Sequence, residues 1–345
     1  MTARAERGRT LPILRQDPTT KEWVIFATER AKRPHDFVKP ATPREAPGWK
    51  TTCPFCPGNE ASTPPESFVL PAGGSSSWSV RVVSNKFAAL VPGGTTEHQE
   101  VGRIYREMKG TGAHEVIVES PEHNQTLARM PESQIVNVLR AYQRRYLALR
   151  EEPWAKLILI FRNHGESAGT SLEHPHSQII ATPVVPKDIR RKYEVATTYY
   201  DDTGRCLYCD VLKEERALGE RLIIDTDRFV VFHPFASKFP FETWIGPKRH
   251  QPSFGNLPEE DFPELAHVLK LTLESLHKAL GEPDYNYVIH SAPVEDERKS
   301  YYLWHIQIIP RLTKVAGFEL GSGMSINTAL PEETAKFMRE MIGFS

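Results

Sequence analysis

The chain carries the same set of landmarks twice in the same order, and this repetition restricts its fold more than any other feature. Cys-x-x-Cys pairs begin at Cys53 and at Cys206, and each pair is followed by a histidine, a helix pattern, a strand pattern and a second histidine. A chain of 345 residues is also longer than one ordinary hydrophobic core requires. The order therefore predicts two tandem domains of one α+β type, residues 1–190 and 191–345.

The spacing around the first histidine of each half supports the duplication. His123 lies eight residues before Pro131, and His250 lies eight residues before Pro258. Each Pro is followed by Glu, which is typical of a helix N-terminus, and apolar residues then recur with a helical period. Runs of strand composition predict an antiparallel sheet in each half. These runs are 22–28, 79–83, 114–119, 156–162, 222–224, 229–232 and 285–290.

Charge and hydropathy exclude several functional classes. The formal net charge is -1, and no basic, aromatic-lined stripe indicates a nucleic-acid partner. No apolar run approaches the ~20 residues that cross a bilayer, and residues 1–15 lack the apolar centre of a secretory signal. We therefore expect a cytoplasmic protein with neither a nucleic-acid nor a membrane partner.

The cysteine pairs and the paired histidines predict two metal sites. A structural zinc ion takes four ligands, commonly two Cys and two His, and close Cys pairs in a reducing compartment are typical of metal binding. Two free thiol pairs, or redox-active pairs, are the alternative. The first predicted ligand set is Cys53, Cys56, His123 and His174, and the second is Cys206, Cys209, His250 and His305.

The run His174-Pro175-His176-Ser177-Gln178 is the most specific motif in the chain. In a strand, alternate side chains share a face, so His174, His176 and Gln178 would project together. A neutral imidazole is a nucleophile toward phosphorus near pH 7, and an amide N–H can stabilise the charge that develops on a phosphoryl oxygen. We predict that His176 is a catalytic nucleophile and that Gln178 assists it; a core histidine is the alternative.

The second half offers an internal comparison. Its matching run is Trp304-His305-Ile306-Gln307, in which the expected metal ligand is kept and Gln307 takes the place of His176. One half would then carry the nucleophile, and the metal of the other half would be structural only.

The motif at residues 174–178, the Cys-Pro-Phe-Cys run at residues 53–56 and the duplicated plan resemble the galactose-1-phosphate uridylyltransferase family, the transferase branch of the histidine-triad superfamily. The resemblance covers nearly the whole chain. It implies two tandem histidine-triad-like (HIT-like) domains and a nucleotidyltransferase that passes UMP from UDP-glucose to galactose 1-phosphate in a ping-pong reaction. It also implies zinc, with another metal as an option in the second site, and a homodimer.

The resemblance assigns roles to further residues. Arg30 and Arg33 would reach the phosphates or the base of the nucleotide, and Asn85 would read the base or the ribose. Glu319 would bind hexose hydroxyls. The residues expected to line the α-phosphate pocket are Asn163, Gly169 and Ser171, with Gln178 on the phosphoryl group.

The chain departs from the family pattern in the segment that meets the acceptor. Phe318 stands where the family has Tyr, Ser325 where it has Gln, and Thr313 where it has Lys. Two alternatives therefore stay open. One is an adenylyltransferase similar to ADP-glucose phosphorylase, which passes AMP to phosphate. The other is a histidine-triad hydrolase, against which Gln178 argues because hydrolysis would gain from a third His.

Overall fold

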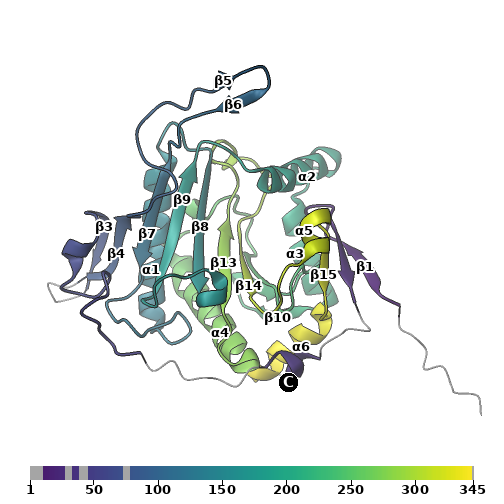
Figure 1. Cartoon of the computed structure of the whole chain (residues 1–345). Helices are drawn as coiled ribbons and strands as arrows, with labels where there is room; N and C mark the ends of the chain where they lie inside the picture. Colours follow the sequence, from purple (N-terminus) through teal and green to yellow (C-terminus); the bar gives the residue numbers. More distant parts are fainter. Residues whose placement is uncertain (1–10, 28–32, 39–45, 73–77, 344–345) are drawn as a thin grey trace, which may run out of the picture.

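The computed structural model describes residues 11–27, 33–38, 46–72 and 78–343. Within these residues lie six α-helices and fifteen strands, joined by loops and short 3₁₀ turns (Figure 1). The helices are α1 (Glu132–Arg150), α2 (Lys187–Thr203), α3 (Leu207–Leu218), α4 (Phe262–Leu280), α5 (Gly317–Ser322) and α6 (Pro331–Ile342). The strands are β1 (Ile13–Gln16), β2 (Trp23–Phe26), β3 (Glu66–Pro71), β4 (Trp78–Ser84), β5 (Gln99–Val101), β6 (Tyr105–Glu107), β7 (Ala113–Val118), β8 (Leu157–His164), β9 (His176–Thr182), β10 (Leu222–Asp225), β11 (Phe229–Phe232), β12 (Thr243–Pro247), β13 (Tyr285–His290), β14 (His305–Pro310) and β15 (Ser325–Asn327).

Ten of these strands form one antiparallel sheet that joins the two halves of the chain. Its order is β10-β11-β12-β14-β13-β8-β9-β7-β4-β3. Counted outward from the central β8–β13 pair, the strands of the two halves correspond in order: β9 matches β14, β7 matches β12, β4 matches β11 and β3 matches β10. At this seam Asn286 pairs with Asn163 and Tyr287 with Arg162. The α+β class and the duplication are therefore confirmed.

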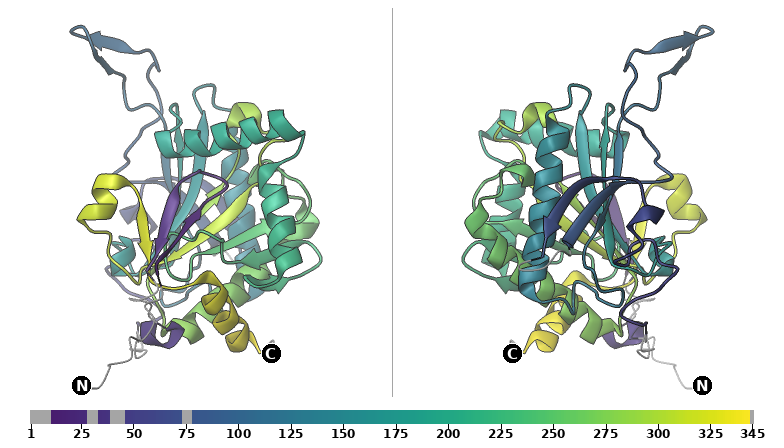
Figure 2. Two further views of the ribbon diagram at one scale, coloured as in Figure 1. Left: turned by 90° about the vertical axis from the view of Figure 1, so that its right-hand side faces the viewer. Right: turned by 90° about the vertical axis from the view of Figure 1, so that its left-hand side faces the viewer.

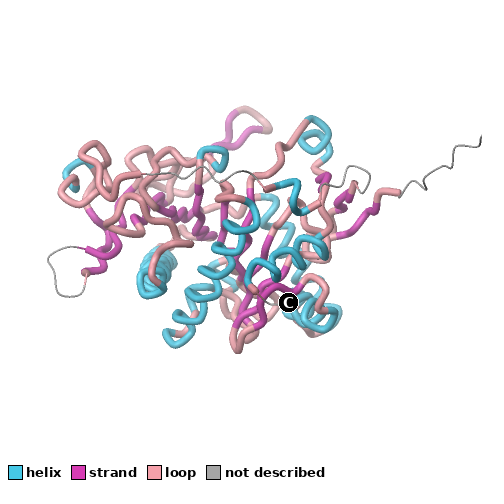
Figure 3. Tube along the Cα trace, turned by 90° about the horizontal axis from the view of Figure 1, so that it is seen from below, coloured by secondary structure: helices cyan, strands magenta, loops and turns pink. Residues whose placement is uncertain are grey.

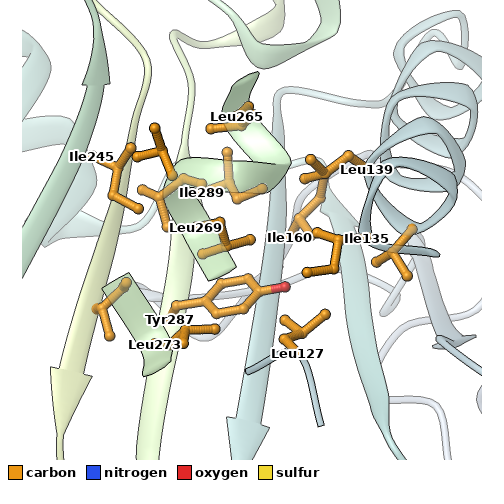
Figure 4. Close-up of a cluster of buried hydrophobic side chains, with 14 of the residues drawn as sticks. Leu127, Ile135, Leu139, Ile160, Ile245, Leu265, Leu269, Leu273, Tyr287 and Ile289 are labelled. Atoms are coloured by element: carbon orange, nitrogen blue, oxygen red, sulfur yellow. The ribbon is translucent and has the colours of Figure 1, made fainter. Parts of the chain in front are cut away.

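Helices α1 and α4 pack side by side on one face of the sheet and bury the main core. Ile135 and Leu139 of α1 point toward the strands (Figure 4). Leu265 and Leu269 of α4 do the same from the neighbouring helix. Ile160 of β8 meets them from the sheet, so the core is continuous across the seam. Burial of this shared apolar surface is what holds the two halves together.

The opposite face of the sheet is covered unequally. Over the second half, α2 and α3 bury a second cluster that includes Tyr193, Tyr208 and Trp244. Over the first half, the described residues form a smaller buried cluster around Cys53, Phe55 and Cys56. The β5–β6 hairpin projects away from the body (Figure 2). The first half therefore leaves part of β9 accessible on this face.

The segments near the two ends of the chain meet in a small separate sheet, in which β2 pairs antiparallel with β1 and parallel with β15. Seen from below, the strands of the main sheet cross the molecule as a band between helices (Figure 3). Among the described helices, none has the length and apolar character needed to cross a membrane.

Two expected boundaries differ in detail. The first helix starts at Glu132 as predicted, whereas the second starts at Phe262, after a 3₁₀ turn at Glu259–Asp261, with Pro263 in its first turn. The proposed division after residue 190 falls in the first turn of α2. The division into domains 1–190 and 191–345 therefore stays a prediction, because strands of both halves belong to one sheet.

Candidate active site and metal centres

His176 opens β9 and is held by the backbone of the residue two positions earlier. Its Nδ1 lies 2.8 Å from the carbonyl oxygen of His174. A carbonyl only accepts hydrogen bonds, so Nδ1 carries the proton and Nε2 keeps its lone pair. His174 itself lies before the strand, so only His176 and Gln178 of the motif share the strand face as predicted.

Burial keeps the imidazole of His176 neutral. The side chain is 7% exposed. Desolvation, with a smaller contribution from the positive charge of Arg162, lowers the pKa of His176 to about 4. At neutral pH the ring is therefore the free base that an attack on phosphorus requires.

Asn163 lies beside His176 on the neighbouring strand. Phe161 pairs with Gln178 in the β8–β9 register. Two residues farther along both strands, this register places Asn163 opposite His176 on the same face. The predicted nucleophile thus has one amide side chain two residues along its own strand, from Gln178, and another directly across, from Asn163.

The amide of Gln178 is oriented by His114 of β7. The backbone N–H of Ala89 donates to Nδ1 of His114 at 3.1 Å, which leaves the proton of a neutral ring on Nε2. Nε2 lies 2.7 Å from Oε1 of Gln178 and donates to it. The amide NH₂ of Gln178 is then free to donate to a substrate. Nδ2 of Asn85 lies 3.4 Å from the same Oε1, so the structure also brings Asn85 to this site.

A buried ion pair lies behind His176 on the helix side of the sheet. Arg162 and Glu119 are 2% and 0% exposed and form a close contact. Nη1 of Arg162 also lies 3.4 Å from the carbonyl oxygen of His176. Glu119 accepts a hydrogen bond from Tyr142 at 2.9 Å and contacts Ser177, so its charge is compensated inside the core.

A cavity of about 360 Å³ opens at the end of the strands that carry this site. Its lining includes His176, Asn163 and Arg162, together with Ser171 of the loop between β8 and β9. The loop turns at Gly165, where φ is 86° and an added Cβ would lie 1.7 Å from Oδ1 of Asp284. Only glycine fits there, so the loop packs directly on the second half.

The first predicted metal site is assembled. The donor atoms of its four residues lie within 4.8 Å of one another. Nδ1 of His174 lies 3.6 Å from the sulfur of Cys53 and of Cys56, and 3.3 Å from Nδ1 of His123. A tetrahedral zinc ion with ordinary bond lengths would give edges of about 3.5 Å between sulfur and nitrogen and about 3.3 Å between two nitrogens.

The groups around these ligands also fit a metal ion. Nε2 of His174 lies 2.8 Å from the carbonyl oxygen of Ser120, which directs the lone pair of Nδ1 toward the sulfurs. Nε2 of His123 lies 3.6 Å from a carboxylate oxygen of Glu173. A hydrogen-bonded outer partner such as the carbonyl of Ser120 is typical of a histidine that binds a metal.

The second predicted site is only partly assembled. Cys206, Cys209 and His250 form a group whose donor atoms lie within 4.8 Å, with the Cys209 sulfur 3.2 Å from Nδ1 of His250. His305 lies outside this group. Its Nδ1 faces the carbonyl oxygen of Leu303 at 3.2 Å, and its ring stacks on Trp244. The expectation that His305 completes the second site is therefore not met.

The sheet explains this difference. β14 begins at His305 as β9 begins at His176, and both rings face the carbonyl oxygen two residues earlier. In the structure His305 is thus the counterpart of His176 and not of His174, which corrects the comparison made from sequence. The ring of His305 is 3% exposed and stacks on Tyr208, Trp244 and His290, so aromatic side chains enclose it.

The remaining predicted residues lie in three different places. Gly169 ends a 3₁₀ turn in the loop that carries Ser171, with a φ of 86°. Arg33 precedes a 3₁₀ turn whose His35 packs on Phe337 of α6, and it does not line the cavity. Glu319 lies in α5 and accepts from the N–H of Ala316 at 2.9 Å, also away from the cavity. Arg30 lies outside the described residues.

Sequence reasoning missed several residues of this site. Arg162 carried a signal, because a lone charge at the end of the apolar run 157–161 must find a partner when the strand is buried. His114 and Asn286 carried none, because their partners are distant in sequence and only the sheet register brings them together.

Nearly the whole chain matches two models of one family. Residues 4–186 match the N-terminal domain of galactose-1-phosphate uridyl transferase, and residues 190–341 match its C-terminal domain. The chain belongs to this family. It is therefore an enzyme of the nucleotidyltransferase class, as the motif at His176 predicts.

Relatives within the family carry two different names. The chain is 38% identical to an ADP-glucose phosphorylase of Arabidopsis thaliana over 335 residues, with 96% of this chain and 93% of the relative covered. It is 31% identical to a galactose-1-phosphate uridylyltransferase of Thermotoga maritima, with 95% and 98% covered. A crystal structure of an Arabidopsis ADP-glucose phosphorylase with bound ADP-glucose matches with a TM-score of 0.80 and 35% identity, covering 96% of this chain and 99% of that one.

Proposed function

We propose that this enzyme moves a nucleoside monophosphate from a nucleotide sugar to a second phosphate compound by double displacement, with Nε2 of His176 as the nucleophile. One observation carries the proposal: the hydrogen bond from Nδ1 of His176 to the carbonyl oxygen of His174 leaves Nε2 as a lone pair on a buried, neutral ring.

The first half-reaction forms one bond and breaks one. The Nε2 lone pair attacks the α-phosphorus, and the bond from this phosphorus to the bridging oxygen breaks. The hexose 1-phosphate leaves with the electron pair of that bond. The nucleotidyl group then stays on His176 as a phosphoramidate.

The second half-reaction reverses these events with a different oxygen. A phosphate oxygen of the acceptor attacks the same phosphorus, and the P–N bond breaks to return the lone pair to Nε2. Gln178 and Asn163 flank the reacting atom and can donate to its non-bridging oxygens in both directions. Because both substrates are phosphates, one arrangement of donors serves both steps.

We propose zinc as the metal of both cysteine groups, held by Cys53, Cys56, His123 and His174 in the first. Bound there, zinc would supply structural cross-linking and would take no part in the transfer. Cys206, Cys209 and His250 would hold the second ion, with another metal as an option.

UDP-glucose and galactose 1-phosphate are the proposed substrates, which places the enzyme in galactose metabolism. The support is the name that both family models and the Thermotoga relative share. In the cell we propose a cytoplasmic homodimer, in line with the family resemblance. Light scattering of the purified protein and fractionation of cells test the last two points.

Adenylyl transfer from ADP-glucose to phosphate is a second candidate, and two specific observations favour it. The first is the 38% identity to an ADP-glucose phosphorylase and the fit to a structure that contains ADP-glucose. The second is the acceptor segment, where Phe318 lacks the hydroxyl of Tyr and Ser325 is shorter than Gln.

One labelling experiment separates the two candidates. The enzyme is mixed with UDP-glucose or with ADP-glucose, each labelled at the α-phosphate, and acid-labile label on the protein is measured. The donor that labels the protein identifies the base. Release of the label by galactose 1-phosphate or by inorganic phosphate identifies the acceptor. If neither donor labels the protein, the covalent mechanism is wrong.

A further inference from the structure

Strand β13 belongs to the second half, yet it lies next to β8, the strand of the first half that is adjacent to β9 and His176. We propose that Asn286 of this strand is a positioning residue, which fixes the side-chain amide of Asn163 so that its NH₂ group faces the phosphoryl group carried by His176. The inference rests on the proposed function of His176 and extends it to a residue of the other half.

The orientation of the Asn286 amide is determined at both ends. Nε of Arg311 donates to Oδ1 of Asn286, and a guanidinium has donors only. Nδ2 of Asn286 donates to the carbonyl oxygen of Ala168 at 2.9 Å, and a carbonyl only accepts. Either contact alone excludes the flipped amide, and Asn286 is only 9% exposed, so water does not compete for these groups.

This orientation decides that of Asn163. Nδ2 of Asn286 also lies 2.7 Å from Oδ1 of Asn163 and donates to it. The oxygen of the Asn163 amide is therefore occupied on the side of the second half. Its backbone is held as well, because Oγ1 of Thr170 donates to the carbonyl oxygen of Asn163 at 2.8 Å.

The sheet register places this amide beside the reacting atom. Asn286 pairs with Asn163 across the seam. The β8–β9 register ends at the pair of Phe161 and Gln178, and its continuation by two residues puts Asn163 opposite His176, with which it lines one cavity. The three residues form one row on one face of the sheet. With its oxygen turned to Asn286, Asn163 presents N–H donors along this row toward His176.

The direction of the amide matters because the transferred group is an anion. N–H donors stabilise the charge that develops on the phosphoryl oxygens, whereas an amide oxygen in their place would repel it. Loss of one such donor reduces the rate of comparable reactions by about 100-fold or more. Arg311 is not among the residues that line the cavity, so it would act on the reaction through the amides of Asn286 and Asn163.

The same strand also holds the loop that follows Asn163. Asp284 accepts hydrogen bonds from the backbone N–H and the hydroxyl of Ser167, at 2.8 and 2.6 Å. Asn286 reaches the loop at Ala168. Two side chains of the second half therefore determine the position of the loop and the direction of the amide at its start.

The variant Asn286→Asp tests the inference with little change of shape. A carboxylate still pairs with Arg311, but it can only accept from Asn163. The Asn163 amide must then turn, with its oxygen toward His176. We expect the rate of protein labelling from the α-labelled donor to fall by about 100-fold, with the KM for the donor changed far less.

A double-variant cycle separates positioning from general damage. In Asn163→Ala no amide is left to orient, so adding Asn286→Asp should reduce the rate no further. The control is Asn256→Asp, since the Asn256 side chain also accepts from an arginine, Arg150, but lies exposed on the surface. This control should keep the rate of the unmodified enzyme.

The outcomes are distinct. An unchanged rate in Asn286→Asp, or an equal loss with and without Asn163, overturns the positioning role while the enzyme still labels. If Asn286→Asp does not fold, Asn286→Leu provides the test, again with and without Asn163→Ala, because Leu has a similar size and removes the donor that holds Oδ1 of Asn163. If the unmodified enzyme is labelled by neither donor, the proposed function fails, and this inference fails with it.

Discussion

His174 and His176 are joined by one hydrogen bond, in which Nδ1 of His176 donates to the carbonyl oxygen of His174 at 2.8 Å. The side chain of His174 faces the two cysteine sulfurs, while its backbone sets the tautomer of the nucleophile. A metal bound at the first site would therefore anchor the residue that orients the ring of the proposed nucleophile.

Replacing the nucleophile should abolish transfer without loss of structure. In His176→Ala we expect the rate of labelling to fall by about 10⁴-fold or more, because the variant has lost the atom that would carry the nucleotidyl group, and the lone pair of His174 in the same cavity faces the cysteine sulfurs. Zinc content and melting temperature should match those of the unmodified enzyme. Turnover retained in the variant would rule out the covalent intermediate on His176.

Removal of a ligand of the first site should cost metal and stability together. Cys53 is buried beside Cys56 and His174, and its replacement by Ala would leave three ligands without a fourth. We expect the loss of one zinc equivalent and a fall of about 3 kcal/mol or more in the free energy of unfolding.

Cys209→Ala is the matched variant in the second site, and it should lose the other zinc equivalent while keeping the first. Atomic absorption and urea unfolding report both quantities. Full zinc content in Cys53→Ala with unchanged unfolding would show that the first site is wrongly assigned.

The pair of His114 and Gln178 predicts a non-additive effect on transfer. His114→Phe removes the donor that holds Oε1 of Gln178, so the amide can rotate. We expect a loss of about 10-fold in the rate for His114→Phe and about 100-fold for Gln178→Ala. The double variant should equal Gln178→Ala, as measured by single-turnover labelling; additive losses would mean that His114 acts by another route.

His233 predicts part of the pH dependence of stability. It is 1% exposed, its Nδ1 lies 2.8 Å from Oγ1 of Thr334, and burial lowers its pKa from 6.5 to about 3. Between these two values the unfolded chain binds a proton here that the folded chain does not. The free energy of unfolding should therefore fall as the pH falls from 6.5 toward 3, with a slope of up to about 1.4 kcal/mol per pH unit from this residue.

The variant His233→Gln removes this contribution. Urea unfolding at pH 7, 6, 5 and 4 should give a shallower loss of stability than in the unmodified protein, with His290 and His305 still contributing. Parallel curves for the two proteins would exclude His233 as a source of the pH dependence.

The duplication and the grouping of residues at the first site could be predicted from the sequence, because both depend on residue types at short spacing along the chain. Helical periodicity, strand composition and the paired cysteines each involve residues close along the chain, and the buried face follows from them. The order of histidines after each Cys pair predicted the group of Cys53, Cys56, His123 and His174, whose donor atoms the fold does bring within 4.8 Å of one another.

The second site is a case in which such local patterns did not predict the correct group of residues. His305 follows Cys206 in the expected order. Its position at the start of β14, however, makes it the counterpart of His176, and its ring stacks on Trp244. A shift of two residues along a strand keeps the same face, so spacing alone could not distinguish the two alignments. The strand in which each histidine lies, and the residues around it in the sheet, distinguish the two alignments.

By itself the sequence determined the α+β class and the repeat, and it predicted the nucleophile and the first ligand set, because these depend on residue type and on short spacing. Only the tertiary structure decided which way the amides beside His176 point. That direction depends on obligate donors and acceptors, Ala89 for Gln178 and Arg311 for Asn163, which lie far away in sequence. Hydrogen-bond direction is a property of groups brought together by the fold, and no local pattern encodes it.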